Sequence, residues 1–274
     1  MNTEIPFSEE EYLALLELAF EVAQSIKGKV SSDGRKPDSQ YLALKLYTHA
    51  ATVYWLYQGT KVPVPASTGG SSFIDFSSIA VITRAAIETY ITFFEVFVAP
   101  ANSDEFEFQY CLWHLAGNVF IEKLGPVDSS VKEQYKMAQQ EIEVLRNRLR
   151  ATAKFASLKR KEQKIVIEGR RTRDWNSIAK SAGFGIEFLK RRIYSYYSGF
   201  VHSDGFAASQ LMSAQKKEDQ LFYAKIHLVT LMILLSKFIL DYEHLFEEVR
   251  DIIPKFKAAH ERAIMWSEIV RRFD

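Results

Sequence analysis

Cysteine, glycine and proline are all scarce in this sequence, and each shortage excludes a class of protein. The single cysteine, Cys111, excludes an intrachain disulfide and a cysteine-rich zinc site. This fits a reducing compartment. With only 12 glycines and 7 prolines, few turns can be built and long regular elements are favoured. A hydrophobic fraction of 47% and a charged fraction of 25% exclude a disordered or collagenous chain.

Signals for secretion and membrane insertion are also missing. The chain begins with glutamates at positions 9–11 where a signal peptide needs basic residues and then an apolar run. The most apolar stretch, 221–240, contains Lys225, His227 and Lys237 spread along its length. Charged and polar groups at such intervals favour a buried helix over a membrane span. We therefore expect a cytoplasmic protein with no membrane partner.

The common catalytic and cofactor motifs are absent. The sequence contains no GxxxxGK[ST] or GxGxxG loop, no HExxH, no GxSxG elbow and no EF-hand loop. Kinase, P-loop, zincin and α/β-hydrolase chemistry therefore have no support. The histidines outside the polar clusters described below have no neighbours at metal-ligand spacing, so we expect no metal site and no cofactor.

Helical periodicity dominates the chain and predicts an all-α fold, a multi-helix bundle of about eight to nine helices. Ser8 and Glu11 have the spacing of a capping box at the start of the first helix, about 8–27. Two prolines and two glycines mark 59–72 as a loop. An almost wholly apolar helix is expected over about 77–98, and a long one over about 218–246. No repeat or composition shift separates the chain, so 1–274 is expected to form a single domain.

The segment 128–173 is expected to be a charged, basic helical arm or a covering segment within that domain. Its helix has one apolar stripe on an otherwise charged surface: Val131, Tyr135, Ala138, Ile142, Leu145 and Leu149. One interpretation is a surface helix docked on the core. The other is a helical hairpin or an arm that forms a homodimer.

Positive charge is concentrated between residues 146 and 173, where eleven basic residues face only two acids, Glu162 and Glu168. The segment therefore carries +9 and the rest of the chain −8, since the total is +1. Such a run can neutralise phosphates and bind RNA; the alternative is a solvated face that binds nothing. Only Phe155 and Trp175 lie near the run, so stacking on single strands is not indicated.

Two clusters of polar residues are candidates for chemistry. Arg84 and Glu88 lie four residues apart in the apolar helix, with Glu95 on roughly the same face. They form either an internal ion pair or the wall of a pocket.

The second cluster precedes and includes His202. Helical geometry places Ser195, Ser198 and Arg191 on the same face as His202, so that a guanidinium, two hydroxyls and an imidazole share it. The alternative is a helix end whose polar groups bond locally. We take His202, Arg84 and Glu88 as candidate catalytic residues, and Arg191, Ser195, Ser198, His114 and Tyr197 as candidate binding residues.

These residues carry a family resemblance. Arg84-Ala-Ala-Ile-Glu88, Trp175 after a basic linker, and the run Tyr194 to His202 resemble a bacterial helical family known as domain of unknown function five-six-seven-seven, over about 79–246. A histidine at a helix end is more distantly similar to the HEPN superfamily, helical proteins of toxin–antitoxin and abortive-infection systems. Many of those are metal-independent ribonucleases with an arginine four to six residues before the histidine, whereas this sequence has Tyr196, Tyr197 and Ser198 in that window.

Three hypotheses follow. The first is a HEPN-like, defence-related protein that interacts with RNA and, if it is an enzyme, cleaves RNA without a metal, with His202 as general acid or base and Arg84 or Arg191 stabilising phosphate charge. The second is a non-enzymatic dimeric interaction protein. The third is a small-molecule binding module whose pocket is lined by Arg84, Glu88, His114 and His202.

Overall fold

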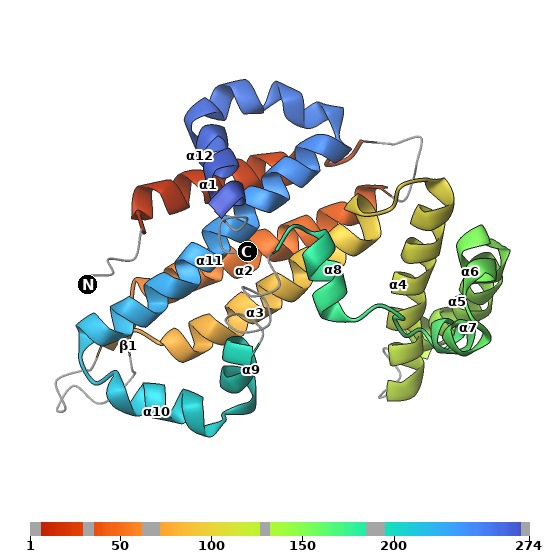
Figure 1. The fold of residues 1–274 in the computed structure, drawn as a ribbon, viewed down its shortest axis with the longest axis horizontal. Coiled ribbons are helices and arrows are strands. Elements are labelled where there is room, and N and C mark those ends of the chain that lie inside the picture. The colour runs from red at the N-terminus through yellow and green to blue at the C-terminus, as the bar shows by residue number, and fades with distance from the viewer. Residues whose placement is uncertain (1–6, 30–35, 62–71, 127–131, 185–194, 270–274) are drawn as a thin grey trace. The chain divides into compact units, whose positions relative to one another are not determined.

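The computed structural model describes residues 7–29, 36–61, 72–126, 132–184 and 195–269. The chain is all-α (Figure 1), as predicted, with twelve α-helices in the described residues where eight or nine were expected. Within these ranges, β-strand structure is limited to a minimal antiparallel hairpin between Thr60–Lys61 (β1) and Ser72–Phe73 (β2). The hairpin brackets the predicted loop, whose residues 62–71 lie outside the described part.

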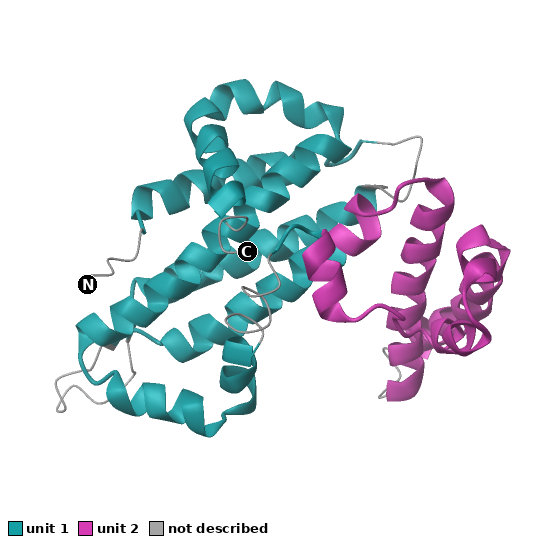
Figure 2. Cartoon of the chain, in the orientation of Figure 1, with its two compact units in different colours: residues 1–93, 182–274 teal, residues 94–181 magenta. Residues whose placement is uncertain are grey.

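The chain divides into two compact units (Figure 2). Unit 1 contains residues 1–93 and 182–274, and unit 2 contains residues 94–181. The single domain over 1–274 stays a prediction.

Unit 1 is built around one long apolar helix, α11. Its helices are α1 (Glu9–Gln24), α2 (Ser39–Tyr57), α3 (Phe76–Phe93), α9 (Ser195–His202), α10 (Gly205–Ser213), α11 (Lys217–Leu245) and α12 (Lys257–Ile269), with 3-10 turns at Lys36–Asp38, Glu247–Asp251 and Ile253–Phe256. Helices α1, α2, α3 and α12 all contact α11 (Figure 1). By length and composition α11 could cross a membrane, but 67% of its most apolar window is buried inside the protein, as in the core helix of a bundle.

Only half of the capping box predicted at the start of α1 is formed, because Glu11 contacts a distant helix. Ser8 Oγ accepts a hydrogen bond from Glu11 N at 3.3 Å, which is the first half of the predicted capping box. The Glu11 carboxylate instead contacts α12: Oε1 lies 3.3 Å from Arg262 Nε, and Oε2 accepts from Trp266 Nε1. Glu11 therefore ties the two ends of unit 1 together.

Unit 2 contains a π-helical turn over Phe94–Val98 and five helices: α4 (Ser103–Leu124), α5 (Lys132–Ala151), α6 (Ala153–Ser157), α7 (Arg160–Ile167) and α8 (Trp175–Ser181). The side chain of Asn102 caps α4, and that of Thr152 caps α6. Asp104 also accepts from the backbone N–H groups of Ala153 and Lys154, so one carboxylate on α4 holds the start of α6.

The apolar stripe of α5 is used inside the chain. Ala138, Ile142, Leu145 and Leu149 are buried. The last three belong to one core cluster with Phe108, Cys111, Leu112, Leu115 and Val119 of α4 and Val166 of α7. Burial of each large side chain contributes about 1.5–3 kcal/mol relative to exposure. The stripe is therefore a docking face within unit 2, and it is not free to form the dimer arm; Val131 lies outside the described residues.

Candidate functional site

The predicted pair on α3 is present. Arg84 Nε lies 3.2 Å from Glu88 Oε1, one helical turn away. The side chain of Arg84 is 15% exposed and that of Glu88 is 51% exposed. Because Glu88 reaches solvent, the pair is screened, and it contributes about 0.3–0.5 kcal/mol as an ordinary i,i+4 ion pair.

Glu95 does not share the surroundings of that pair. The α-helix ends at Phe93 and continues as a π-helical turn, so the 100° step that placed Glu95 near Glu88 no longer applies. Glu95 is buried in unit 2, where its Oε2 lies 2.9 Å from Arg171 Nε. Burial raises the pKa of the Glu95 carboxyl, and Arg171 and Arg173 oppose that rise. Glu95 is therefore a buried carboxyl that contacts Arg171 and so anchors the basic segment.

The polar face of α9 is divided between solvent and core. His202 and Ser195 are exposed, Ser198 is half-buried and Tyr197 is buried. Arg191 lies outside the described residues. Helix α9 contacts α3, which carries Arg84 and Glu88, while His114 belongs to unit 2. The shared pocket of Arg84, Glu88, His114 and His202 therefore stays a prediction.

A buried hydrogen-bond chain connects α9 to α11, and sequence reasoning missed it. Tyr197 Oη donates to Thr230 Oγ1 at 3.1 Å, and Thr230 Oγ1 donates to the Ile226 carbonyl at 3.0 Å. His227 Nδ1 lies 3.1 Å from Tyr197 Oη and must be the donor there, because the tyrosine proton is already committed to Thr230. Among the described residues, Nε2 of His227 is then a buried acceptor without a partner.

The environment of His227 keeps its ring neutral. The side chain is fully buried, and desolvation lowers its pKa to about 3. A ring with this pKa cannot exchange protons near neutral pH, so His227 is a packing residue with a fixed tautomer rather than a general acid. No spacing rule in the sequence distinguishes it from an ordinary helical histidine.

Part of the basic segment is neutralised by acids of unit 2. Five of its eleven basic side chains are paired with acids: Arg146 with Glu143, Arg148 with Glu107, Lys154 with Glu105, Arg170 with Glu168 and Arg171 with Glu95. Two more have polar acceptors nearby, since Arg150 donates to Asn147, and Arg173 donates to the Ser177 carbonyl and Ser181 Oγ. Because Glu168 is already counted in the +9 of the segment, the four acids outside it, Glu143, Glu107, Glu105 and Glu95, lower that charge to +5.

Four basic side chains on and beside α7 differ from the others. They are Lys159, Arg160, Lys161 and Lys164, and together we call them the α7 surface. All four are exposed, and within the described ranges none has an ion-pair partner. Arg160 and Lys164 are one turn apart, as are Lys161 and Lys164, so like charges lie side by side at a cost of a few tenths of a kcal/mol per pair.

Contacts with the rest of unit 2 hold α7, and with it the α7 surface, in place. Val166 of α7 is buried in the α4–α5 core. Arg146 Nε donates to the carbonyl of Ile167 at 3.1 Å, which satisfies the C-terminal end of the helix. Gln163 Nε2 donates to the Phe155 carbonyl at 3.2 Å. These contacts fix the face from which the four cations project.

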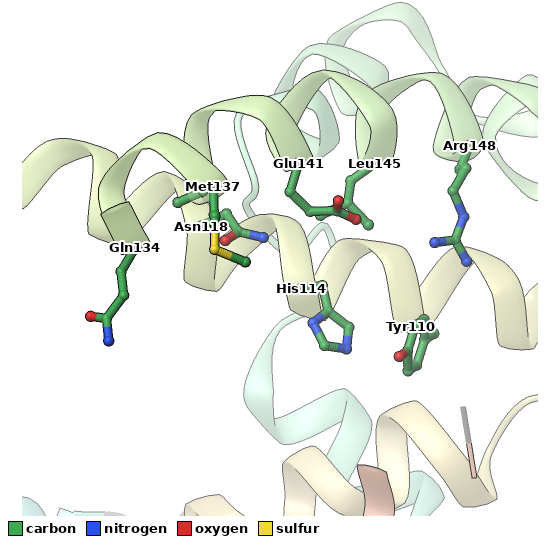
Figure 3. Close-up of a pocket in the computed structure, with 9 residues that line it drawn as sticks. Tyr110, His114, Asn118, Gln134, Met137, Glu141, Leu145 and Arg148 are labelled. Carbon is green, nitrogen blue, oxygen red and sulfur yellow. The ribbon is translucent and has the colours of Figure 1, made fainter. Parts of the chain in front are cut away.

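His114 is the predicted site residue that lines a cavity in unit 2, between α4 and α5 (Figure 3). In the described part of the chain, no three histidine, cysteine, aspartate or glutamate side chains come together as a metal site would need. No family model matches this chain, and no curated protein and no solved structure matches it either. The resemblance to the two helical families therefore stays a prediction.

Proposed function

We propose that this protein binds RNA through the phosphate groups, using the α7 surface. The observation that carries the proposal is that, in the described part of the chain, the four cations of the α7 surface have no ion-pair partner. Of the other seven basic residues of the segment, five pair with acids and two donate to neutral acceptors. Adjacent like charges weaken a short helix. Four of them in six residues, against the single acid Glu162, leave a charge of +3 that a polyanion would balance.

The side chains near the α7 surface indicate whether it would contact the phosphates or the bases of RNA. The nearest aromatic side chain, Phe155, is packed against the unit 2 core, so bases have no ring to stack on there. Lysine and arginine then contact phosphates without reading bases. We therefore expect binding to double-stranded or folded RNA with little sequence preference.

The test is the salt dependence of binding to a short RNA duplex, followed by fluorescence anisotropy. Four phosphate contacts give a slope of log K against log salt of at most about −3.6. Replacing the α7 surface by Lys159→Gln, Arg160→Gln, Lys161→Gln and Lys164→Gln should weaken binding and bring that slope close to zero.

A matched control removes four exposed lysines from elsewhere in unit 2: Lys123, Lys132, Lys136 and Lys180. Changing them to glutamine alters the net charge equally. If the control variant loses as much affinity as the α7 variant, general charge and not this surface binds RNA, and the proposal is wrong.

Metal-independent cleavage is a second candidate function, because the exposed end of α9 leaves His202 accessible to a substrate. RNA cleavage in the presence of EDTA that stops in His202→Ala would support it. RNA that stays intact with the parent protein would leave binding as the function.

A further inference from the structure

A cavity of about 430 Å³ lies between α4 and α5, and all of its lining residues belong to unit 2. Small-molecule sites in proteins have volumes of roughly 300–1,000 Å³. The cavity follows one face of α5, on which Met137, Glu141, Leu145 and Arg148 are spaced at three or four residues. Figure 3 shows Asn118 next to Met137 at one end and Tyr110 toward Arg148 at the other.

The walls combine apolar and aromatic groups with a few polar ones. Ala138 and Leu145 close the inner side, and both are buried. Tyr110 and His114 are in ring contact at 4.4 Å between centroids. Met137 is 62% exposed at the rim. An exposed thioether beside a cavity is typical of surfaces that adapt to small apolar ligands.

The two charges of the lining are not equivalent. Glu107 Oε1 lies 2.8 Å from Arg148 Nε, and this bond raises the pKa of the guanidinium, so the positive charge already has a counter-ion. Within the described part of the chain, Glu141 has no ion-pair partner. The exposed carboxylate of Glu141 therefore gives the rim of the cavity one negative charge without a counter-ion among the described residues.

We infer that the cavity binds an amphipathic organic cation, a molecule with one ammonium group and an aromatic or apolar body. The ammonium would pair with Glu141. Met137 lies one turn from Glu141 on the same helix face, so a body of a few carbons reaches its thioether from that anchor. This inference goes beyond RNA binding and does not depend on it.

The test compares three probes with similar phenyl bodies and different charge: 2-phenylethylammonium, 2-phenylethanol and 3-phenylpropanoate. Isothermal titration calorimetry should give the tightest binding for the cation and the weakest for the anion, with at least a tenfold difference between them. Glu141→Gln should reduce the affinity for the cation to that for the alcohol. Met137→Ala should weaken the cation and the alcohol alike, because it removes apolar contact only.

Glu133→Gln is the matched control, since Glu133 is exposed on the same helix and does not line the cavity. Unchanged affinity in this variant and in the α7 variant would support the inference and separate it from RNA binding. No saturable binding of 2-phenylethylammonium by the parent protein would overturn it. Tighter binding of the carboxylate, or a Glu141→Gln variant with full affinity, would do the same.

Discussion

The buried ring of His227 predicts a specific loss of stability in mild acid. Burial lowers its pKa from the ordinary 6.5 to about 3. Below pH 6.5 the His227 ring is therefore protonated in the unfolded chain, whereas it stays neutral in the folded protein. Stability from this residue is complete above pH 6.5 and is lost progressively as the pH falls toward 3.

The difference between the two pKa values of His227 sets how much the free energy of unfolding falls with pH. Each pH unit between the two pKa values costs about 1.4 kcal/mol. From pH 7 to pH 5 the unfolded chain becomes almost fully protonated at this position while the native ring stays neutral, which lowers the free energy of unfolding by about 2 kcal/mol. Urea denaturation followed by circular dichroism at both pH values measures this loss.

Other groups also titrate between pH 7 and pH 5. The contribution of His227 is therefore measured as the difference in pH-dependent loss of stability between the parent protein and a variant without this ring. His227→Asn removes the titrating ring and keeps a donor near the Nδ1 position toward Tyr197. We expect its pH-dependent loss to be smaller by about 2 kcal/mol than that of the parent. His202→Asn, which removes an exposed histidine, should follow the parent. A parent and His227→Asn with equal losses, or a His227 ring that titrates near pH 6 by NMR in the native protein, would refute the reasoning.

Two further predictions concern unit 2. Ile142→Asp together with Leu145→Asp buries two unpaired carboxylates in the α4–α5 core, so the helical circular dichroism signal should fall sharply. A variant with full helicity and half the parent's mass in sedimentation would instead support the dimer arm. Asp104→Ala removes the acceptor of the Ala153 and Lys154 N–H groups and should cost about 1–2 kcal/mol in urea denaturation, with Asp104→Asn, which keeps one oxygen, losing less.

Local patterns in the sequence predict the helix starts well, because a cap depends only on neighbouring residues. Asn102 caps α4 by accepting from the N–H of Glu105, and Asp174 caps the short helix α8 by accepting from the N–H of Ser177. The Ser8 hydroxyl also behaves as predicted. The partner of Glu11 could not be predicted, since Arg262 and Trp266 lie some 250 positions away and only the fold brings them to α1.

The apolar stripe of α5 shows a second kind of limit. Its periodicity predicts a buried face but does not say what buries it. The same four-and-three spacing suits a core helix and a dimer arm. The partner turned out to be α4 of the same unit, whose apolar positions Phe108, Leu112, Leu115 and Val119 have the complementary spacing.

The net charge of a segment, counted from the sequence, does not show which of its charges are paired in the fold. The +9 of 146–173 predicts an extended cationic surface, yet the acids that neutralise it lie mostly outside the segment, on the N-terminal half of α4 and at Glu95. An ion pair forms at 3–4 Å, so only the positions of Glu105 and Glu107 in space decide which cations remain available. The α7 surface is what remains once these ion pairs and the neutral acceptors of Arg150 and Arg173 are both taken into account. For that reason the RNA proposal depends on four residues and not on eleven, and a variant confined to those four can refute it.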